Sequence, residues 1–216
     1  MEKRNQRVLI AAVMMFISFV VWTLLVCTFD IKPIGPRESL VGVATLNGSF
    51  HKLTGVNMAL YTVTDWLGLV PVAVALGFAS LGLFQWIRRK SFKKVDFTLF
   101  VLGGFYVITF AAYLLFEMYP LNFRPVLIDG VLEASYPSST TLLVCCIMPA
   151  AIIQLEKRVK RKKIKVCLNA IIVVFCGFMV TARLISGVHW LSDIIGGMLL
   201  SASLVAAYYY VSNIKR

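Results

Sequence analysis

The sequence predicts an all-α membrane protein with six transmembrane helices, built as a single domain over residues 1–216. Three observations lead to this fold class. The mean hydropathy is +0.83 and 59% of the residues are hydrophobic. Only 15% are charged, against about 25% in soluble domains. The 22 Lys and Arg residues stand in short clusters between apolar runs, so the net charge of +12 does not indicate a nucleic-acid partner.

Six apolar runs are long enough, or nearly so, to cross about 30 Å of hydrocarbon as helices. The first follows a basic start, as in a signal peptide, but its length and the lack of a small-x-small cleavage site predict a retained span. The fourth contains Pro149 and ends where a basic run begins. The expected spans are 8–29, 66–87, 97–117, 138–155, 166–183 and 190–211.

The basic clusters predict the orientation of the chain. They lie near the N-terminus, at 88–94, at 157–165 and at Lys215 and Arg216. Because short loops rich in Lys and Arg remain on the cytoplasmic side, we expect both termini to be cytoplasmic. In the first outer loop, the apolar stretch 56–63 is expected to lie along the membrane interface as a short helix.

Glycine and cysteine residues within the apolar runs have structural interpretations. Two pairs, Gly103-Gly104 and Gly196-Gly197, are expected to let neighbouring helices approach closely. The five cysteines do not have the spacing of a metal site and are expected to be buried small hydrophobic residues. We predict neither a metal nor a cofactor.

The stretch between the last two spans carries the strongest chemical signal. His189 and Asp193 are four residues apart and would share one helix face. The carboxylate could then hold one imidazole nitrogen and leave the other free to attack an electrophile. Arg183 lies six residues upstream of the histidine, and its guanidinium group suits phosphate oxygens.

Two further outer-loop segments add groups that bind anions. Arg124-Pro125 supplies a second guanidinium on a rigid backbone. Ser138, which follows Pro137, offers a hydroxyl and the amides of a helix N-terminus. Together with His189 and Asp193, these residues predict a phosphate-binding pocket with a nucleophile, and a phosphoryl transfer from a lipid to water.

The order and spacing of these residues resemble the type 2 phosphatidic acid phosphatase superfamily, whose members share an active-site pattern with vanadium haloperoxidases. The family motifs are Lys-x6-Arg-Pro, Pro-Ser-Gly-His and Ser-Arg-x5-His-x3-Asp. The third motif aligns with Arg183, His189 and Asp193, with Ala182 in place of its serine. By this resemblance, His189 would form a phosphohistidine and Asp193 would orient it.

The first two motifs depart from the family pattern. Glu117 stands where the first motif has its lysine, seven residues before Arg124. In the second motif, Pro137 and Ser138 match, but Ser139 replaces the glycine and Thr140 replaces the histidine. In the family that histidine protonates the leaving group, a role for which a threonine hydroxyl is too weak an acid.

Two hypotheses account for the missing acid. The substrate could be a lipid diphosphate such as undecaprenyl diphosphate, whose leaving phosphate, with a second pKa of about 6, needs little protonation. Alternatively, Glu117 could remain protonated beside the phosphate and donate the proton. A structural alternative for Glu117 is an ion pair with Arg124 or Arg183.

The resulting expectation is a lipid phosphate or diphosphate phosphatase in a plasma membrane of bacterial type, with its site facing outside. Its partners would be the lipid substrate and membrane lipids; the sequence predicts no oligomeric state. Two alternatives remain open: a catalytically impaired protein that binds or transports a lipid phosphate, and a phosphotransferase that moves the group to a lipid acceptor.

Overall fold

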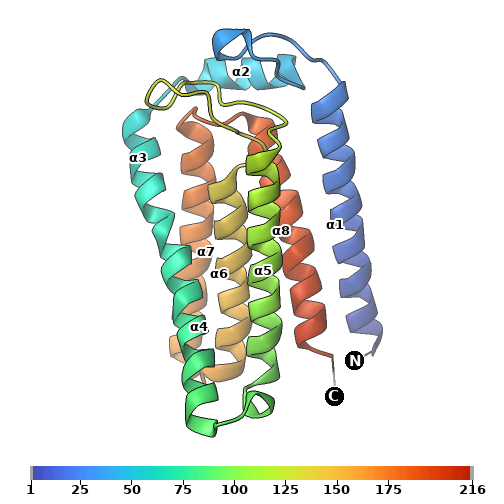
Figure 1. Cartoon of the computed structure of the whole chain (residues 1–216), viewed down its shortest axis with the longest axis vertical. Helices are drawn as coiled ribbons and strands as arrows, with labels where there is room; N and C mark the ends of the chain where they lie inside the picture. The colour runs from blue at the N-terminus through green and yellow to red at the C-terminus, as the bar shows by residue number, and fades with distance from the viewer. Residues whose placement is uncertain (1, 215–216) are drawn as a thin grey trace.

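The computed structural model describes residues 2–214, and these residues form helices joined by loops, with isolated bridges in place of strands. Six of its helical segments are long and apolar enough to cross a membrane, as the sequence predicts. The helices form a bundle (Figure 1). In order they are α1 (Glu2–Thr28), α2 (Ala44–Thr54), α3 (Met58–Leu67), α4 (Leu69–Arg89), α5 (Phe97–Met118), α6 (Ser139–Arg158), α7 (Lys162–Ile185) and α8 (Leu191–Ser212), with 3-10 turns at Pro36–Glu38 and Phe92–Lys94.

The second span is longer than the sequence predicts, and the expected interfacial helix at 56–63 is wrong. Asn57 caps α3 by accepting a hydrogen bond from the Leu60 amide at 2.9 Å. Gly68 keeps a right-handed helical conformation, so α3 continues into α4 as one segment, Met58–Arg89. The helix that lies across one end of the bundle is α2 instead (Figure 1).

One end of the bundle carries the two ends of the described chain and a cluster of charged residues around Asp96 (Figure 1). α1 begins and α8 ends at the same end, where the connections from α4 to α5 and from α6 to α7 also lie (Figure 1). Asp96 binds Gln85, Arg89 and Arg158 there, which joins α4, α5 and α6. The predicted cytoplasmic residues Lys215 and Arg216 lie outside the described part of the chain.

The core lies around α6, which contributes nine buried residues and packs against α4, α5, α7 and α8, while α1 packs along α8. Other helices expose apolar side chains on the outer surface of the bundle. The prediction that every cysteine is buried is therefore wrong for Cys27 and Cys167, which are exposed. In a membrane, an apolar side chain can face lipid as well as the protein core.

The two glycine pairs behave differently. A Cβ atom at Gly196 would lie 2.6 Å from Tyr136 Cε2, and one at Gly197 would lie 3.2 Å from the Ser138 carbonyl oxygen. The prediction of close approach is thus confirmed for this pair. It is wrong for Gly103 and Gly104, where an added Cβ would meet nothing within 4 Å.

α2 is fixed to the first turn of α8 by a buried asparagine. The Asn47 side chain donates to the Gly42 carbonyl at 2.8 Å and to Ser192 Oγ at 2.9 Å, and its oxygen accepts from the Ser192 amide at 3.0 Å. Trp22 on α1 donates to the Ser192 carbonyl at 3.0 Å. Ser192, the residue next to Asp193, is therefore held by α2 through Asn47 and by α1 through Trp22.

Candidate active site

His189 lies in the tight connection between α7 and α8. Gly187 has a φ of 68°, and a Cβ atom there would lie 1.8 Å from the Gly55 carbonyl oxygen, so only glycine fits. The Asn57 amide also donates to the Ser186 carbonyl at 2.9 Å. The segment between α2 and α3 therefore packs directly on the loop that carries the histidine.

Asp193 is completely buried in the first turn of α8. Its Oδ2 accepts a hydrogen bond from the Trp190 amide at 2.8 Å and another from the Ser135 hydroxyl. Ser192 Oγ donates to Oδ1 at 3.3 Å. A carboxylate with several donors is fixed in position, and its negative charge is compensated by them.

The two nitrogens of His189 have different surroundings. Nδ1 lies 3.6 Å from Asp193 Oδ2 and 3.3 Å from Ser135 Oγ. Nε2 is buried and has no hydrogen-bond partner among the described residues. One side of the ring is therefore held by the protein, and the other is available to a ligand.

The electrostatic surroundings favour the neutral imidazole. Burial, together with the positive charges of Arg124 and Arg183, holds the pKa of His189 well below its ordinary value of 6.5. A neutral ring keeps a lone pair on its unprotonated nitrogen, which a nucleophile requires.

Arg124 and Arg183, which are 59 positions apart in the numbering, are brought together around the ring of Tyr61 on α3. Their guanidinium carbons lie 5.7 and 4.7 Å from the ring centroid. Each contact is a cation–π interaction, which offsets part of the cost of burying two positive charges close together.

Both arginines also have carboxylate partners, and neither partner is Glu117. Arg183 Nη2 lies 3.4 Å from Asp65 Oδ1, and Arg124 Nε lies 3.1 Å from Glu133 Oε2. The Arg183 side chain also donates to Thr64 Oγ1 at 3.1 Å. Arg183 Nε and Arg124 Nη1 are buried without hydrogen-bond partners among the described residues. Guanidinium donors thus remain available for an anion.

Ser138 caps α6, as the sequence predicts. Its hydroxyl accepts hydrogen bonds from the Thr141 amide at 3.4 Å and the Thr141 hydroxyl at 3.1 Å. The Ser138 amide donates to the Asp193 carbonyl at 3.1 Å, which brings the start of α6 against α8. Thr140 is half-buried in the first turn of α6 and does not line the cleft that contains His189.

Glu117 lies in the last turn of α5 and lines the same small cleft as His189 and Ser135. The cleft also includes Tyr136, Pro137 and Ser139. Glu117 forms no ion pair with Arg124 or Arg183 in the described part of the chain. The ion pair considered for Glu117 is therefore not formed among the described residues.

Sequence reasoning missed Ser135, Tyr61 and Asp65. Ser135 has no motif spacing, but it follows the outer-loop charges closely and precedes Tyr136-Pro137. Tyr61 lies in the stretch that was expected to be interfacial, and Asp65 lies one helical turn later. Their polar groups inside an apolar run were the available signal, because such groups usually face a partner within the bundle.

The fold and site define a multi-pass membrane protein whose polar groups can bind an anion beside a neutral imidazole. The described residues contain no group of three or more side chains suited to hold a metal ion. The sequence model of the PAP2 superfamily matches residues 73–216. The chain therefore belongs to the PAP2 superfamily.

A solved structure supports the fold over nearly the whole chain. It is the first transmembrane PAP2 type phosphatidylglycerolphosphate phosphatase from Bacillus subtilis, and it superposes with a TM-score of 0.62 at 19% sequence identity. The match covers 95% of this chain and 98% of that chain. None of the curated proteins matches this chain.

Proposed function

We propose that this protein is a membrane lipid phosphatase that cleaves a lipid diphosphate through a phosphohistidine intermediate. The observation that carries the proposal is the buried, unpartnered Nε2 of His189, whose ring is held from the other side by Asp193 and Ser135. Membership of the PAP2 superfamily and the fold of a phosphatidylglycerolphosphate phosphatase support the same class of activity.

In the proposed first step, which forms the phosphohistidine, each side chain of the site has one role. Arg124 and Arg183 bind the oxygens of the terminal phosphoryl group and neutralise its charge. His189 Nε2 attacks the phosphorus atom, and the bond to the bridging oxygen breaks. Asp193 stabilises the positive charge that develops on the imidazole ring, as the orienting carboxylate does in other nucleophile–base systems.

In the second step, water attacks the phosphorus atom of the phosphohistidine and the bond to Nε2 breaks. Inorganic phosphate leaves, and the imidazole returns to its neutral form. Both protons of the water end on the released phosphate, which exchanges them with the solvent. The lipid product, released in the first step, is the lipid monophosphate.

The second family motif favours a diphosphate substrate. Thr140 stands where the family has the histidine that protonates the leaving group, and it does not line the cleft. A phosphate leaving group has a second pKa of about 6 and can depart without a strong acid. Glu117 lies in the cleft and is the candidate donor for substrates with a poorer leaving group.

The site is proposed to face the outside of a bacterial plasma membrane. The basic loops at 88–94 and 157–165 lie at the end of the bundle opposite α2 (Figure 1). Short basic loops are usually retained in the cytoplasm, which supports an outer location for His189 and the two arginines.

Phosphate release by purified protein tests the proposal. Wild type is expected to release phosphate from undecaprenyl diphosphate faster than from phosphatidic acid or phosphatidylglycerol phosphate, and His189→Ala to lose release from all three. His51→Ala is the matched histidine control and should remain active. Equal or faster hydrolysis of the monoesters would contradict the diphosphate assignment.

A Glu117→Gln variant separates the two explanations of the missing acid. If Glu117 donates the proton, the variant should lose monoester hydrolysis and its pH–rate profile should change, while diphosphate hydrolysis is retained. An unchanged profile at a normal rate would remove Glu117 as the acid.

The second candidate function is a protein that binds or transports a lipid phosphate without turnover. It is favoured by the replacement of the first-motif lysine by Glu117 and of the second-motif histidine by Thr140. Tight binding of the substrates with no difference in phosphate release between wild type and His189→Ala would establish it. Transfer of the phosphoryl group to added lipid alcohol would instead identify a phosphotransferase.

A further inference from the structure

Three cavities follow one another along the side of α5 that faces α4 and α6. The first is the cleft that contains His189, and Tyr113 forms part of its lining. Tyr113 also lines the second cavity, of about 340 Å³, which reaches Tyr106. Tyr106 in turn lines the third cavity, of about 230 Å³. Two tyrosine side chains therefore separate the candidate active site from the far cavity.

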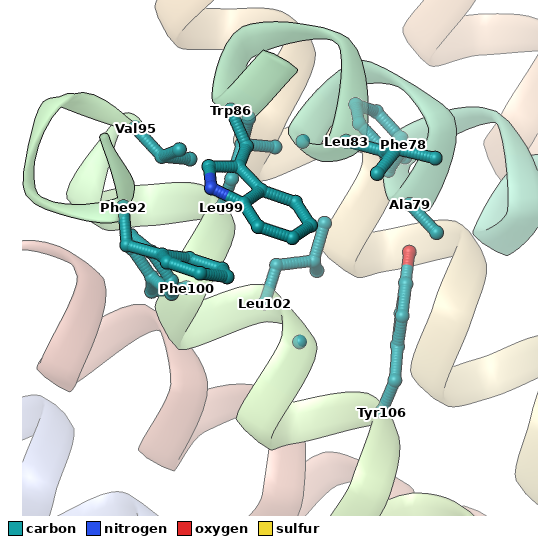
Figure 2. A pocket seen from close by; sticks show the side chains of 12 residues that line it. Phe78, Ala79, Leu83, Trp86, Phe92, Val95, Leu99, Phe100, Leu102 and Tyr106 are labelled. Carbon is teal, nitrogen blue, oxygen red and sulfur yellow. The ribbon is translucent and has the colours of Figure 1, made fainter. Parts of the chain in front are cut away.

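The two inner cavities are lined almost entirely by apolar side chains. The third lies between α4 and α5, and the rings of Trp86 and Phe92 lie across it from Tyr106 (Figure 2). Trp86 and Phe92 stack there with centroids 4.0 Å apart. The Tyr106 hydroxyl points toward Ala79 in Figure 2 and has no hydrogen-bond partner among the described residues. We call the second and third cavities together the α4–α5 groove.

The groove is deeper than one leaflet of a bilayer. The rise along α5 from Glu117, in the His189 cleft, to Leu99, in the third cavity, is about 27 Å at about 1.5 Å per residue. A hydrocarbon core of about 30 Å gives each leaflet about 15 Å. The third cavity therefore lies beyond the midplane as seen from the His189 side.

We infer that the α4–α5 groove binds the hydrocarbon chain of the substrate, and that it selects a single chain long enough to pass the bilayer midplane. This inference rests on the proposed function. Tyr113 lines both the His189 cleft and the second cavity, so the groove begins next to the point where a lipid with its phosphate at His189 starts its chain, and this identifies the occupant. A polyprenyl chain meets the length requirement, whereas the acyl chains of one leaflet end near Tyr106.

Two neighbouring glycines on α5 give a matched test. Gly103 lines the third cavity and Gly104 does not, and an added Cβ at either position meets nothing within 4 Å. Gly103→Phe should therefore occupy the third cavity, and Gly104→Phe should place the same ring on the outer surface. Neither residue belongs to the phosphate site.

The first measurement is hydrolysis of two diphosphates of different length by the full chain. For Gly103→Phe, kcat/KM with undecaprenyl diphosphate should fall at least about tenfold, because the far end of the chain loses buried contacts. With farnesyl diphosphate, which is much shorter, it should stay close to wild type, and Gly104→Phe should leave both unchanged. Equal effects of Gly103→Phe on both substrates would overturn the inference while leaving the phosphatase assignment intact.

The second measurement does not depend on turnover. The His189→Ala protein is incubated with a polyprenyl diphosphate that carries a diazirine on its last isoprene unit, irradiated and mapped by mass spectrometry. Labelling should concentrate on α4 and α5 near Trp86 and Leu99, and Gly103→Phe should reduce it. Labelling spread evenly over α1 and α7, or no binding, would overturn the inference, whereas absence of hydrolysis by wild type would count against the proposed function alone.

Discussion

At the scale of single residues, His189 combines a free nitrogen with a lowered pKa. Both histidines of the chain are affected, because burial also lowers the pKa of His51 from 6.5. In the unfolded chain both rings would take up protons below about pH 6.5, whereas in the folded protein they resist protonation until a lower pH. The free energy of unfolding should therefore fall as the pH is lowered through this interval.

A His189→Gln variant tests this linkage in a His51→Gln background. With His51 replaced, the remaining histidine should give a slope of up to about 1.4 kcal/mol per pH unit below pH 6.5, and replacing His189 should flatten it. Unfolding in detergent micelles between neutral pH and about pH 5 measures both slopes. Identical slopes with and without His189 would show that its ring titrates normally in the folded protein.

The sequence predicted part of this site, and the reason lies in chain distance. The spacing of His189 and Asp193 correctly paired the two side chains, but the expected shared helix face was wrong. α8 begins at Leu191, and His189 reaches Asp193 from the connection before it. Ser135 could not be added, because its contact with both depends on how the outer loop folds over the start of α8. The pairing of Arg124 with Glu133 and of Arg183 with Asp65 depends on tertiary structure in the same way.

At the scale of helices, α8 packs closely against the loop before α6. Gly196→Ala should lower the melting temperature, because its Cβ would lie 2.6 Å from the buried ring of Tyr136. Gly104→Ala is the matched control. It adds a methyl group in open space and should leave stability unchanged or raise it by up to about 1 kcal/mol.

Thermal unfolding of both variants in the same detergent measures this contrast. Equal melting temperatures for Gly196→Ala and Gly104→Ala would contradict the close packing at Tyr136. The contrast also explains why the two glycine pairs could not be distinguished in the sequence. Both lie in apolar helices, and only the tertiary contact shows which of them faces a neighbour and which faces open space.

At the scale of the whole molecule, apolar run length was sufficient to predict six spans, since the hydrocarbon thickness sets that length directly. It was insufficient for the joining of α3 to α4. The expected span began at residue 66, but the helical conformation of Gly68 joins α3 to α4 and the segment begins at Met58. The placement of α2 depends on Asn47, which is fully buried against Ser192, a contact that only the tertiary structure shows.

The orientation of the bundle gives a prediction for intact cells. Lys52→Cys on α2 and Lys160→Cys between α6 and α7 place exposed thiols at opposite ends. In a background without the five native cysteines, a membrane-impermeant maleimide should label the first in intact cells and the second only after permeabilisation. The reverse pattern would place the His189 cleft on the cytoplasmic side.

The position of the α4–α5 groove affects how the rate of hydrolysis should depend on the concentration of the lipid substrate. A lipid whose hydrocarbon chain binds between two helices enters the groove laterally from the bilayer. Its effective concentration is therefore its mole fraction among the surrounding lipids. Adding inert phospholipid at constant total substrate would then slow hydrolysis by surface dilution, although the amount of substrate per volume of water is unchanged. For this fold, the bilayer is the solvent in which affinity is defined.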